Sequence, residues 1–251
     1  MLRPTELAKE DPLMIALFTD FGWAGPYVGQ MRAVLARNES APPVVDLMHD
    51  APAYSARAAG HLLAALADEF PAGTVFVGIV DPGVGSARMP VIVEADGNWF
   101  VGPGNGLFDV LSARATESSW WRITREPERQ SATFHGRDLF APVAASLARG
   151  ESVPGDPIDA PHGPEVGVEL AEVVYIDRYG NAMTGLRAPA DPTASLRVGQ
   201  RELAGGHTFS DVAAGEGLWL VNSLGLVEVV VNQGDAARAY GLTVGSTVAW
   251  C

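Results

Sequence analysis

The sequence is poor in cysteine and in long apolar runs, and each shortage excludes a class of protein. Its one cysteine is Cys251, at the last position, so no internal disulfide can form, which favours a reducing compartment. No apolar run reaches the roughly 18 residues that a membrane-spanning helix needs. Residues 1–6 also lack the apolar core of a signal peptide. We therefore expect a cytoplasmic protein with no membrane partner.

Positive charge is also scarce. Lys and Arg total 17 against 30 Asp and Glu, which gives a formal net charge of −13. This balance disfavours a nucleic acid as partner, because phosphate groups would be repelled. It leaves a cationic small molecule open as a ligand. Acidity also keeps a protein soluble, and the charge alone does not separate these two interpretations.

Signals for metals and for nucleotide phosphates are missing too. The histidines other than His135 have no metal-like spacing, and no cysteine or carboxylate cluster accompanies them, so we expect no metal site. The stretch Gly102–Gly106 lacks the spacing of a dinucleotide loop, and Pro103 restricts it. We interpret it as a shaped turn that lines a pocket. No Walker pattern occurs, and no cofactor is expected.

Strand and helix patterns alternate over the first 150 residues, and this alternation is the main fold signal. Runs rich in Val and Ile, bounded by Gly, Pro and Asp, predict strands over 14–18, 44–48, 74–80 and 89–95. Apolar residues at three- and four-residue spacing predict helices over 27–37, 55–70 and 138–149, the last with Asp138 as N-cap and Gly150 after its end. This predicts an α/β fold, an N-terminal domain with a largely parallel sheet covered on both faces.

The pattern changes after residue 150. Residues 151–164 contain four prolines and three acidic residues, which is typical of a linker. Beyond them come short β-like runs, and helical periodicity is confined to 236–240. We expect a small C-terminal antiparallel β-barrel-like domain. The predicted division is an N-terminal domain over 1–155 and a C-terminal domain over 165–251.

Polar residues follow two of the predicted strands. Asp20 ends the first apolar run, at the edge where open α/β sheets bind ligands. Its carboxylate suits the vicinal hydroxyls of a ribose, although an Asp that caps the next turn has the same pattern. Asp81 follows the strongest strand pattern, and Arg88 lies seven residues further on, close enough to fold back onto it. A pair of this kind orients a carboxylate, and it is equally typical of a structural turn.

His135 and the C-terminal turns complete the candidates. His135 precedes a predicted helix, whose N-terminus disfavours protonation of an imidazole, and a neutral imidazole can orient water. A structural histidine in a turn fits the same position. The turns over 176–181 and 220–225 fit hairpin chemistry. Tyr54 and Tyr179 offer flat faces for an adenine or a sulfonium.

Six motifs together resemble one known family. They are Leu17–Arg32, Val80–Arg88, Phe100–Gly106, Thr133–Asp138, Ile176–Asn181 and Leu220–Gly225. In this order they resemble the S-adenosylmethionine hydroxide adenosyltransferases, relatives of the fluorinase and chlorinase enzymes. The resemblance covers nearly the whole chain, from Phe18 to about Val248. It implies hydrolysis of S-adenosylmethionine to adenosine and methionine, an α/β domain followed by a β-barrel-like domain, and a homotrimer with sites between subunits.

The resemblance also implies roles for individual residues. It implies that Asp81, Arg88 and His135 activate water, that Asp20 holds the ribose and that Tyr54 flanks the sugar or the sulfonium. The amino-acid end of the substrate would be held by Asp177 and Ser223, and the adenine by Tyr179 and Asn181. Two positions depart from the family pattern, because Gly25 and Gly104 stand where the family usually has Asp.

Other functions remain open at this point. A halogenase of the same superfamily is disfavoured by the carboxylate of Asp81, since like charges would repel a halide. A non-catalytic binder of adenosyl ligands is a second alternative. A methyltransferase is less favoured, because no Gly-x-Gly-x-Gly loop follows the first strand.

Overall fold

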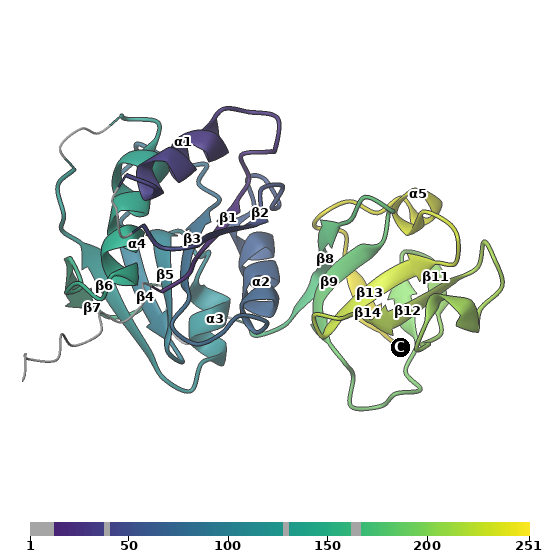
Figure 1. The fold of residues 1–251 in the computed structure, drawn as a ribbon. Coiled ribbons are helices and arrows are strands. Elements are labelled where there is room, and N and C mark those ends of the chain that lie inside the picture. Colours follow the sequence, from purple (N-terminus) through teal and green to yellow (C-terminus); the bar gives the residue numbers. More distant parts are fainter. Residues whose placement is uncertain (1–12, 38–40, 128–130, 162–166) are drawn as a thin grey trace, which may run out of the picture.

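The computed structural model describes residues 13–37, 41–127, 131–161 and 167–251. Two lobes lie side by side, an N-terminal lobe of strands and helices and a C-terminal lobe built mainly of strands (Figure 1). None of the helices in the described part of the chain has the length and apolar character that crossing a bilayer requires.

A seven-stranded sheet forms the centre of the N-terminal lobe, in the order β2-β1-β3-β5-β4-β6-β7. The strands β2, β1, β3 and β5 are parallel, so their carboxyl ends share one edge. The strands β4, β6 and β7 extend the sheet with antiparallel pairing. The strands are β1 (Ile15–Thr19), β2 (Val44–Met48), β3 (Val75–Ile79), β4 (Pro90–Ala95), β5 (Asn98–Pro103), β6 (Ser118–Ile123) and β7 (Gly155–Ile158).

Helices cover both faces of this sheet, as the sequence predicts. Alternate side chains of β3 point to opposite faces, so Val77 packs with one layer of helices and Phe76 with the other. The first layer contains α1 (Tyr27–Leu35), the π-helix η1 (Gly136–Phe140) and α4 (Ala141–Ala148). The second layer contains α2 (Ala56–Ala67) and α3 (Asp109–Arg114).

The C-terminal lobe contains two antiparallel sheets, in the orders β12-β13-β9-β8 and β11-β10-β14. The bridges Glu172↔Thr247 and Gly205↔Trp219 connect their edges, which gives the barrel-like closure that the sequence predicts. The elements are β8 (Leu170–Ile176), β9 (Ala182–Arg187), β10 (Leu196–Val198), β11 (Arg201–Leu203), the 3₁₀ helix η2 (Phe209–Asp211), β12 (Gly217–Val221), β13 (Leu226–Val231), α5 (Ala236–Tyr240) and β14 (Val248–Trp250).

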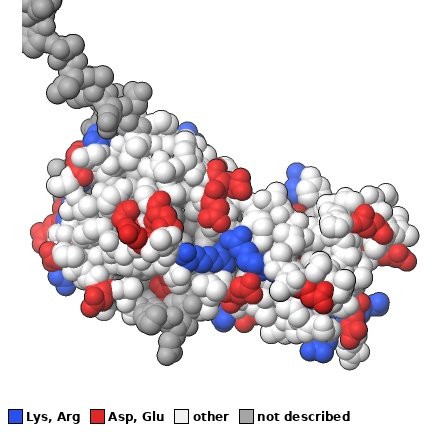
Figure 2. All heavy atoms as spheres, turned by 90° about the horizontal axis from the view of Figure 1, so that it is seen from below, with Lys and Arg blue, Asp and Glu red and all other residues white. Residues whose placement is uncertain are grey.

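The two lobes meet where α2 packs against β8 and β9. The hydroxyl of Tyr175 donates to Asp50 Oδ2 at 2.9 Å, and Arg187 Nη2 donates to Asp68 Oδ2 at 3.3 Å. Arg114 Nε donates to the carbonyl of Val168 at 3.2 Å. Figure 2 shows basic side chains gathered at the junction between the lobes, with acidic side chains beside them. Polar contacts therefore fix the orientation of the C-terminal lobe within one chain.

The α/β class and the antiparallel C-terminal sheets are confirmed. The sequence analysis did not predict the strands β5 and β6 or the helix α3, and two of its local assignments differ from the structure. The segment 151–164 includes β7, which pairs with β6 at the edge of the sheet. The predicted N-cap at Asp138 is wrong, because the helical segment starts at Gly136 and Asp138 lies inside η1. There its carboxylate accepts from the backbone N–H of Ser131 at 2.8 Å. Gly150 follows the end of α4 with φ of 72°, as expected.

Candidate active site

The parallel strands bring three sequence-distant polar residues to one edge. Asp20 follows β1, Asp81 follows β3 and Asn105 follows β5, and these strands are neighbours in the sheet. The backbone N–H of Asp20 donates to the carbonyl of Ile79 at 3.2 Å, so the ends of β1 and β3 are tied together. This is the edge at which open α/β sheets place their ligands.

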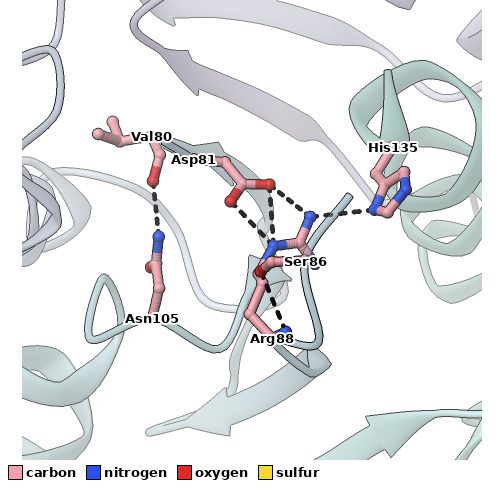
Figure 3. Close-up of polar contacts among 6 residues, drawn as sticks. All are labelled: Val80, Asp81, Ser86, Arg88, Asn105 and His135. Carbon is pink, nitrogen blue, oxygen red and sulfur yellow. Dashed lines mark hydrogen bonds and ion pairs between the residues drawn. The ribbon is translucent and has the colours of Figure 1, made fainter. Parts of the chain in front are cut away.

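Asp81, Arg88 and His135 form one connected network at this edge (Figure 3). Arg88 Nε lies 2.9 Å from Asp81 Oδ1 and 3.0 Å from Oδ2, and Arg88 Nη2 also contacts Oδ2. The same Nη2 lies 3.1 Å from Nδ1 of His135. The side chains of Arg88 and Asp81 are only 10% and 5% exposed. The pair is therefore not a surface salt bridge, and its two-point, charge-assisted bonds fix the orientation of the carboxylate.

The loop between β3 and β4 folds back because of its local turns. The backbone N–H of Ser86 donates to the carbonyl of Gly83 at 3.0 Å, and Ser86 Oγ accepts from the backbone N–H of Arg88 at 3.3 Å. Gly85 has φ of +81°, and a Cβ there would lie 2.8 Å from the carbonyl oxygen of Ala132. A glycine at this position therefore lets the loop reach the segment that precedes His135.

The network defines the protonation of His135. A guanidinium N–H can only donate, so His135 Nδ1 accepts from Arg88 and the ring proton sits on Nε2. Burial lowers the pKa of His135, and the neighbouring positive charge of Arg88 lowers it further. The carboxylates of Asp81 and Asp138 oppose this shift. A neutral imidazole is thus favoured, as the sequence predicts, although burial and Arg88 are the causes.

Asp20 lies in a turn with its own support. Thr19 Oγ1 lies 2.8 Å from His49 Nδ1 and accepts from the backbone N–H of Phe21 at 3.3 Å. Partial burial raises the pKa of Asp20, a backbone hydrogen bond at Asp20 opposes the shift, and Asp81 raises the pKa further. The carboxylate therefore stands close enough to Asp81 for the two charges to interact, and a ligand that donates hydrogen bonds would stabilise both.

Asn105 is a site residue that the sequence analysis missed. Its Nδ2 donates to the carbonyl of Val80 at 2.9 Å and so holds the backbone that leads into Asp81 (Figure 3). Its Oδ1 is buried and has no hydrogen-bond partner among the described residues. In the sequence Asn105 lies in the stretch Gly102–Gly106, but the strand β5 before it was not predicted, so no local pattern marked its role. Its glycine neighbours led us to interpret the stretch only as a turn.

The two tyrosines that are predicted to contact the ligand are exposed to solvent in the single chain. Tyr54 is 84% exposed and Tyr179 is 67% exposed. Trp23 is 63% exposed as well. Its ring centroid lies 4.7 Å from that of His49, the histidine that contacts Thr19 next to Asp20. Exposed aromatic rings of this kind are suited to cover a flat ligand or a second protein surface.

The C-terminal candidates are organised by local hydrogen bonds. Asp177 Oδ1 accepts from the backbone N–H groups of Tyr179 and Asn181 at 2.8 and 2.9 Å. Asn181 Nδ2 donates to Asp177 Oδ2 at 3.0 Å. Asn181 is buried, while Ser223 is exposed in the turn between β12 and β13. The structure thus joins Asp177 and Asn181, and it shows no contact between them and the Asp81 network.

The two departures from the family pattern differ in the space around them. At Gly104 an added Cβ would lie 2.9 Å from Val91 Cγ1 and 3.0 Å from the carbonyl oxygen of Met89. At Gly25 the nearest atom, Tyr27 Cδ2, would lie at an ordinary 3.4 Å. The surroundings of Gly104 therefore exclude a side chain without movement, and those of Gly25 do not.

A hollow of about 560 Å³ lies elsewhere on the N-terminal lobe, and it is lined by α1, α4, Arg125 and Arg137. It does not contain Asp81, Arg88 or His135. In the part of the chain that the structure describes, no three His, Cys, Asp or Glu side chains are grouped so that they could hold a metal ion.

The fold and the buried network together define a two-lobed α/β and β-barrel protein with a carboxylate, a guanidinium and a neutral imidazole held at the ligand-binding edge of its sheet. The chain belongs to the SAM hydroxide adenosyltransferase family. Residues 15–155 match the N-terminal domain of that family, and residues 171–249 match its C-terminal domain.

Individual relatives agree with this membership. A Thermus thermophilus protein named (R)-S-adenosyl-L-methionine hydrolase is 39% identical over 93% of this chain and 98% of its own length. A Salinispora arenicola protein of the same name is 38% identical over 92% of this chain and 95% of its own length. Among solved structures, an uncharacterised conserved protein from Thermotoga maritima has a TM-score of 0.85 and 31% identity, over 95% of this chain and all of that one.

Proposed function

We propose that this protein is an enzyme that hydrolyses S-adenosyl-L-methionine to adenosine and L-methionine. The observation that carries the proposal is the buried Asp81–Arg88–His135 network at the carboxyl edge of the sheet. Two hydrolase relatives, each matching more than nine tenths of this chain, support it.

The proposed reaction is a displacement at C5′ of the adenosyl group. The oxygen of a water molecule forms a bond to C5′, and the C5′–S bond breaks with its electron pair going to sulfur. The leaving group is then the neutral thioether of methionine, so no general acid is needed. The water loses one proton, which leaves toward Asp81. The protein's task is to place the water in line and to exclude competing solvent.

Each member of the network has a distinct part in this scheme. Asp81 orients the water, because each carboxylate oxygen keeps lone-pair capacity beyond its bond to Arg88. Arg88 fixes the carboxylate by two-point pairing and stabilises developing hydroxide character. His135 accepts from Arg88 through Nδ1 and keeps Nε2–H as a donor for the nucleophile. The scheme draws on no cofactor and no metal ion.

The remaining candidates are assigned to substrate binding. In this proposal Asp20 holds the ribose hydroxyls, and Tyr54 flanks the sugar or the sulfonium. Asp177 and Ser223 hold the amino-acid end, and Tyr179 and Asn181 hold the adenine. The exposure of Tyr54 and Tyr179 supports a site that another surface covers.

We infer that this covering surface comes from a second copy of the chain. The chemical network belongs to the N-terminal lobe and the Asp177–Asn181 loop to the C-terminal lobe, with residues 151–164 between the proposed domains 1–155 and 165–251. A head-to-tail ring of three subunits closes such a site with cyclic symmetry. A homotrimer in the cytoplasm, with the small-molecule substrate bound between subunits, is the proposed working form.

The direct test is incubation with S-adenosyl-L-methionine followed by chromatography of the products. Adenosine and methionine in equal amounts are expected. Formation of 5′-chloro- or 5′-fluoro-adenosine without adenosine at physiological halide would instead identify a halogenase. Tight binding of the substrate without any product would identify a non-catalytic binder.

A further inference from the structure

A buried glutamate lies in the C-terminal lobe, outside the Asp81 network. Glu228 is 5% exposed and sits in β13 between two valines. Its neighbours Val227 and Val229 pack into the core of the barrel. Because alternate side chains of a strand point to opposite faces, Glu228 lies on the other face of the sheet. An acidic side chain is almost never buried without a polar partner.

Strand pairing places Glu228 in a row of residues that faces the N-terminal lobe. Glu228 is opposite Met183 of β9, and Met183 is opposite Tyr175 of β8. Met183 and Tyr175 pack against the core of the N-terminal lobe, and the Tyr175 hydroxyl donates to Asp50. Glu228 is thus buried in the same row of the sheet as two residues that pack against the N-terminal lobe.

Two turns with polar side chains flank this row. Asp177 lies two residues after Tyr175, and so continues along the same face beyond the end of β8. At the other turn, Asn222 Oδ1 accepts from the backbone N–H groups of Leu224 and Leu226 at 3.0 and 3.1 Å. Asn222 Nδ2 is buried and has no hydrogen-bond partner among the described residues. A buried amide donor and a buried carboxyl group therefore lie on the same part of the sheet.

Electrostatics agree with this placement. Burial first, and the negative charge of Asp177 second, raise the pKa of Glu228 to about 7, and the side chain of Asn222 opposes the shift. Near neutral pH the carboxyl group is therefore divided between its protonated and ionised forms. A positive charge that neutralises Asp177 would favour the ionised form.

Other charged groups around this face titrate away from neutrality or are paired. Burial of Tyr175 and its bond to Asp50 raise the pKa of the phenol. His61, on α2, has its pKa lowered to about 4 by burial and by Arg114, Arg57 and Arg187. Arg187 is paired with Asp68 and with the carbonyl of Leu224, and Arg57 is paired with Glu172. Glu228 is thus the group on this face that responds near neutral pH.

We propose that Glu228 is a positioning residue that links the arrival of a cationic group at Asp177 to the release of a proton. When an ammonium group pairs with Asp177, the O–H bond of Glu228 breaks and its proton passes to solvent. The resulting carboxylate accepts from Asn222 Nδ2 and fixes the turn that carries Ser223. This inference rests on the proposed function, which assigns the amino-acid end of the substrate to Asp177.

The test is calorimetric binding of S-adenosyl-L-methionine to the Asp81→Ala variant in buffers of different ionisation enthalpy. At about pH 7 a fraction of a proton should be released per site, since a group with a pKa of about 7 is partly protonated there. Adenosine, which lacks the ammonium group, should release none. The double variant Asp81→Ala, Glu228→Gln should bind the substrate without release. Affinity for the substrate should rise with pH up to neutrality in the first variant and stay flat in the second.

Failures of the two proposals are distinguishable. Substrate binding without proton release, while the wild-type chain makes adenosine and methionine, overturns the role of Glu228 and leaves the function intact. Proton release on binding, without any product from the wild-type chain, overturns the function and leaves the coupling intact. Absence of substrate binding contradicts both. If Glu228→Gln does not fold, the pH dependence of proton release by Asp81→Ala decides the role of Glu228: release should decline as the pH rises above the Glu228 pKa of about 7, and release that stays constant there contradicts the role.

Discussion

The N-terminal and C-terminal candidate residues differ in how far their hydrogen bonds reach along the chain. Arg88 joins residues 81 and 135, so the network depends on the whole α/β fold, and the side chains of its Asp81–Arg88 pair are almost fully buried. Asp177 and Asn181 bond only to their own turn, and Tyr179 beside them is exposed. Under the proposed function, the reacting groups are thus held in place within one chain, while the loop assigned to recognition carries an exposed tyrosine.

This difference follows from the physical tasks of the two regions. Groups that act on a nucleophile gain most when their positions are fixed before the substrate arrives. Groups that recognise a flexible ligand can be completed by the ligand or by a neighbouring subunit. The comparison therefore predicts separable effects on turnover, on binding and on assembly.

The largest expected effect is the loss of turnover in Asp81→Ala. Removal of the carboxylate takes away the group that orients the water, so kcat should fall by about 10²- to 10⁴-fold. Substrate affinity should stay within about tenfold, because the role of Asp81 lies with the nucleophile. Steady-state kinetics and calorimetry measure the two quantities. Asp156→Ala, which breaks an exposed ion pair with Arg122 in the same lobe, is the matched control and should keep full activity. Full turnover by Asp81→Ala would show that the catalytic assignment is wrong.

Asp20→Ala should act on binding. Ribose hydroxyls left without their acceptor would weaken substrate affinity by roughly 1–3 kcal/mol. The measurement is the dissociation constant of adenosine, which carries the ribose and lacks the amino-acid end. Unchanged affinity for adenosine would leave Asp20 as a turn-forming residue only.

Mixing two inactive variants tests whether the two regions meet between subunits. The substitutions Asp81→Ala and Asn181→Ala lie in different lobes. In mixed trimers some sites would therefore combine an unmutated N-terminal lobe with an unmutated C-terminal lobe. Part of the wild-type activity should return when the subunits are allowed to exchange. The control is each variant exchanged with itself. A fully active monomer by light scattering at the assay concentration contradicts the shared site.

The smallest effects concern the two glycines. Gly25→Asp should leave the melting temperature nearly unchanged, since its nearest atom would be at ordinary contact distance. Gly104→Asp should lower the melting temperature, because its Cβ would crowd Val91 and the Met89 carbonyl. Thermal unfolding of the two variants side by side checks the contrast. Equal stability would mean that the loop at Gly104 adapts without strain.

The sequence predicts β1 to β4 and the helices α1, α2 and α4, because their apolar patterns reflect burial, but it misses β5, β6 and α3. It also places Arg88 close enough to Asp81 to fold back onto it, and the structure joins the two side chains. It does not reveal the roles of Asn105 or Glu228. Asn105 depends on β5 lying next to β3, and Glu228 depends on strand register and on the packing of the two lobes. The neighbours of each strand and the packing of the lobes depend on tertiary structure, and no local sequence pattern indicates them.

The most direct test of the account is turnover in water enriched in heavy oxygen. If the Asp81 network activates water for attack at C5′, the label should appear in the 5′-hydroxyl of adenosine and the methionine should stay unlabelled. Unlabelled adenosine, or label in the methionine, would contradict attack of water at C5′ and with it the central role assigned to Asp81, Arg88 and His135.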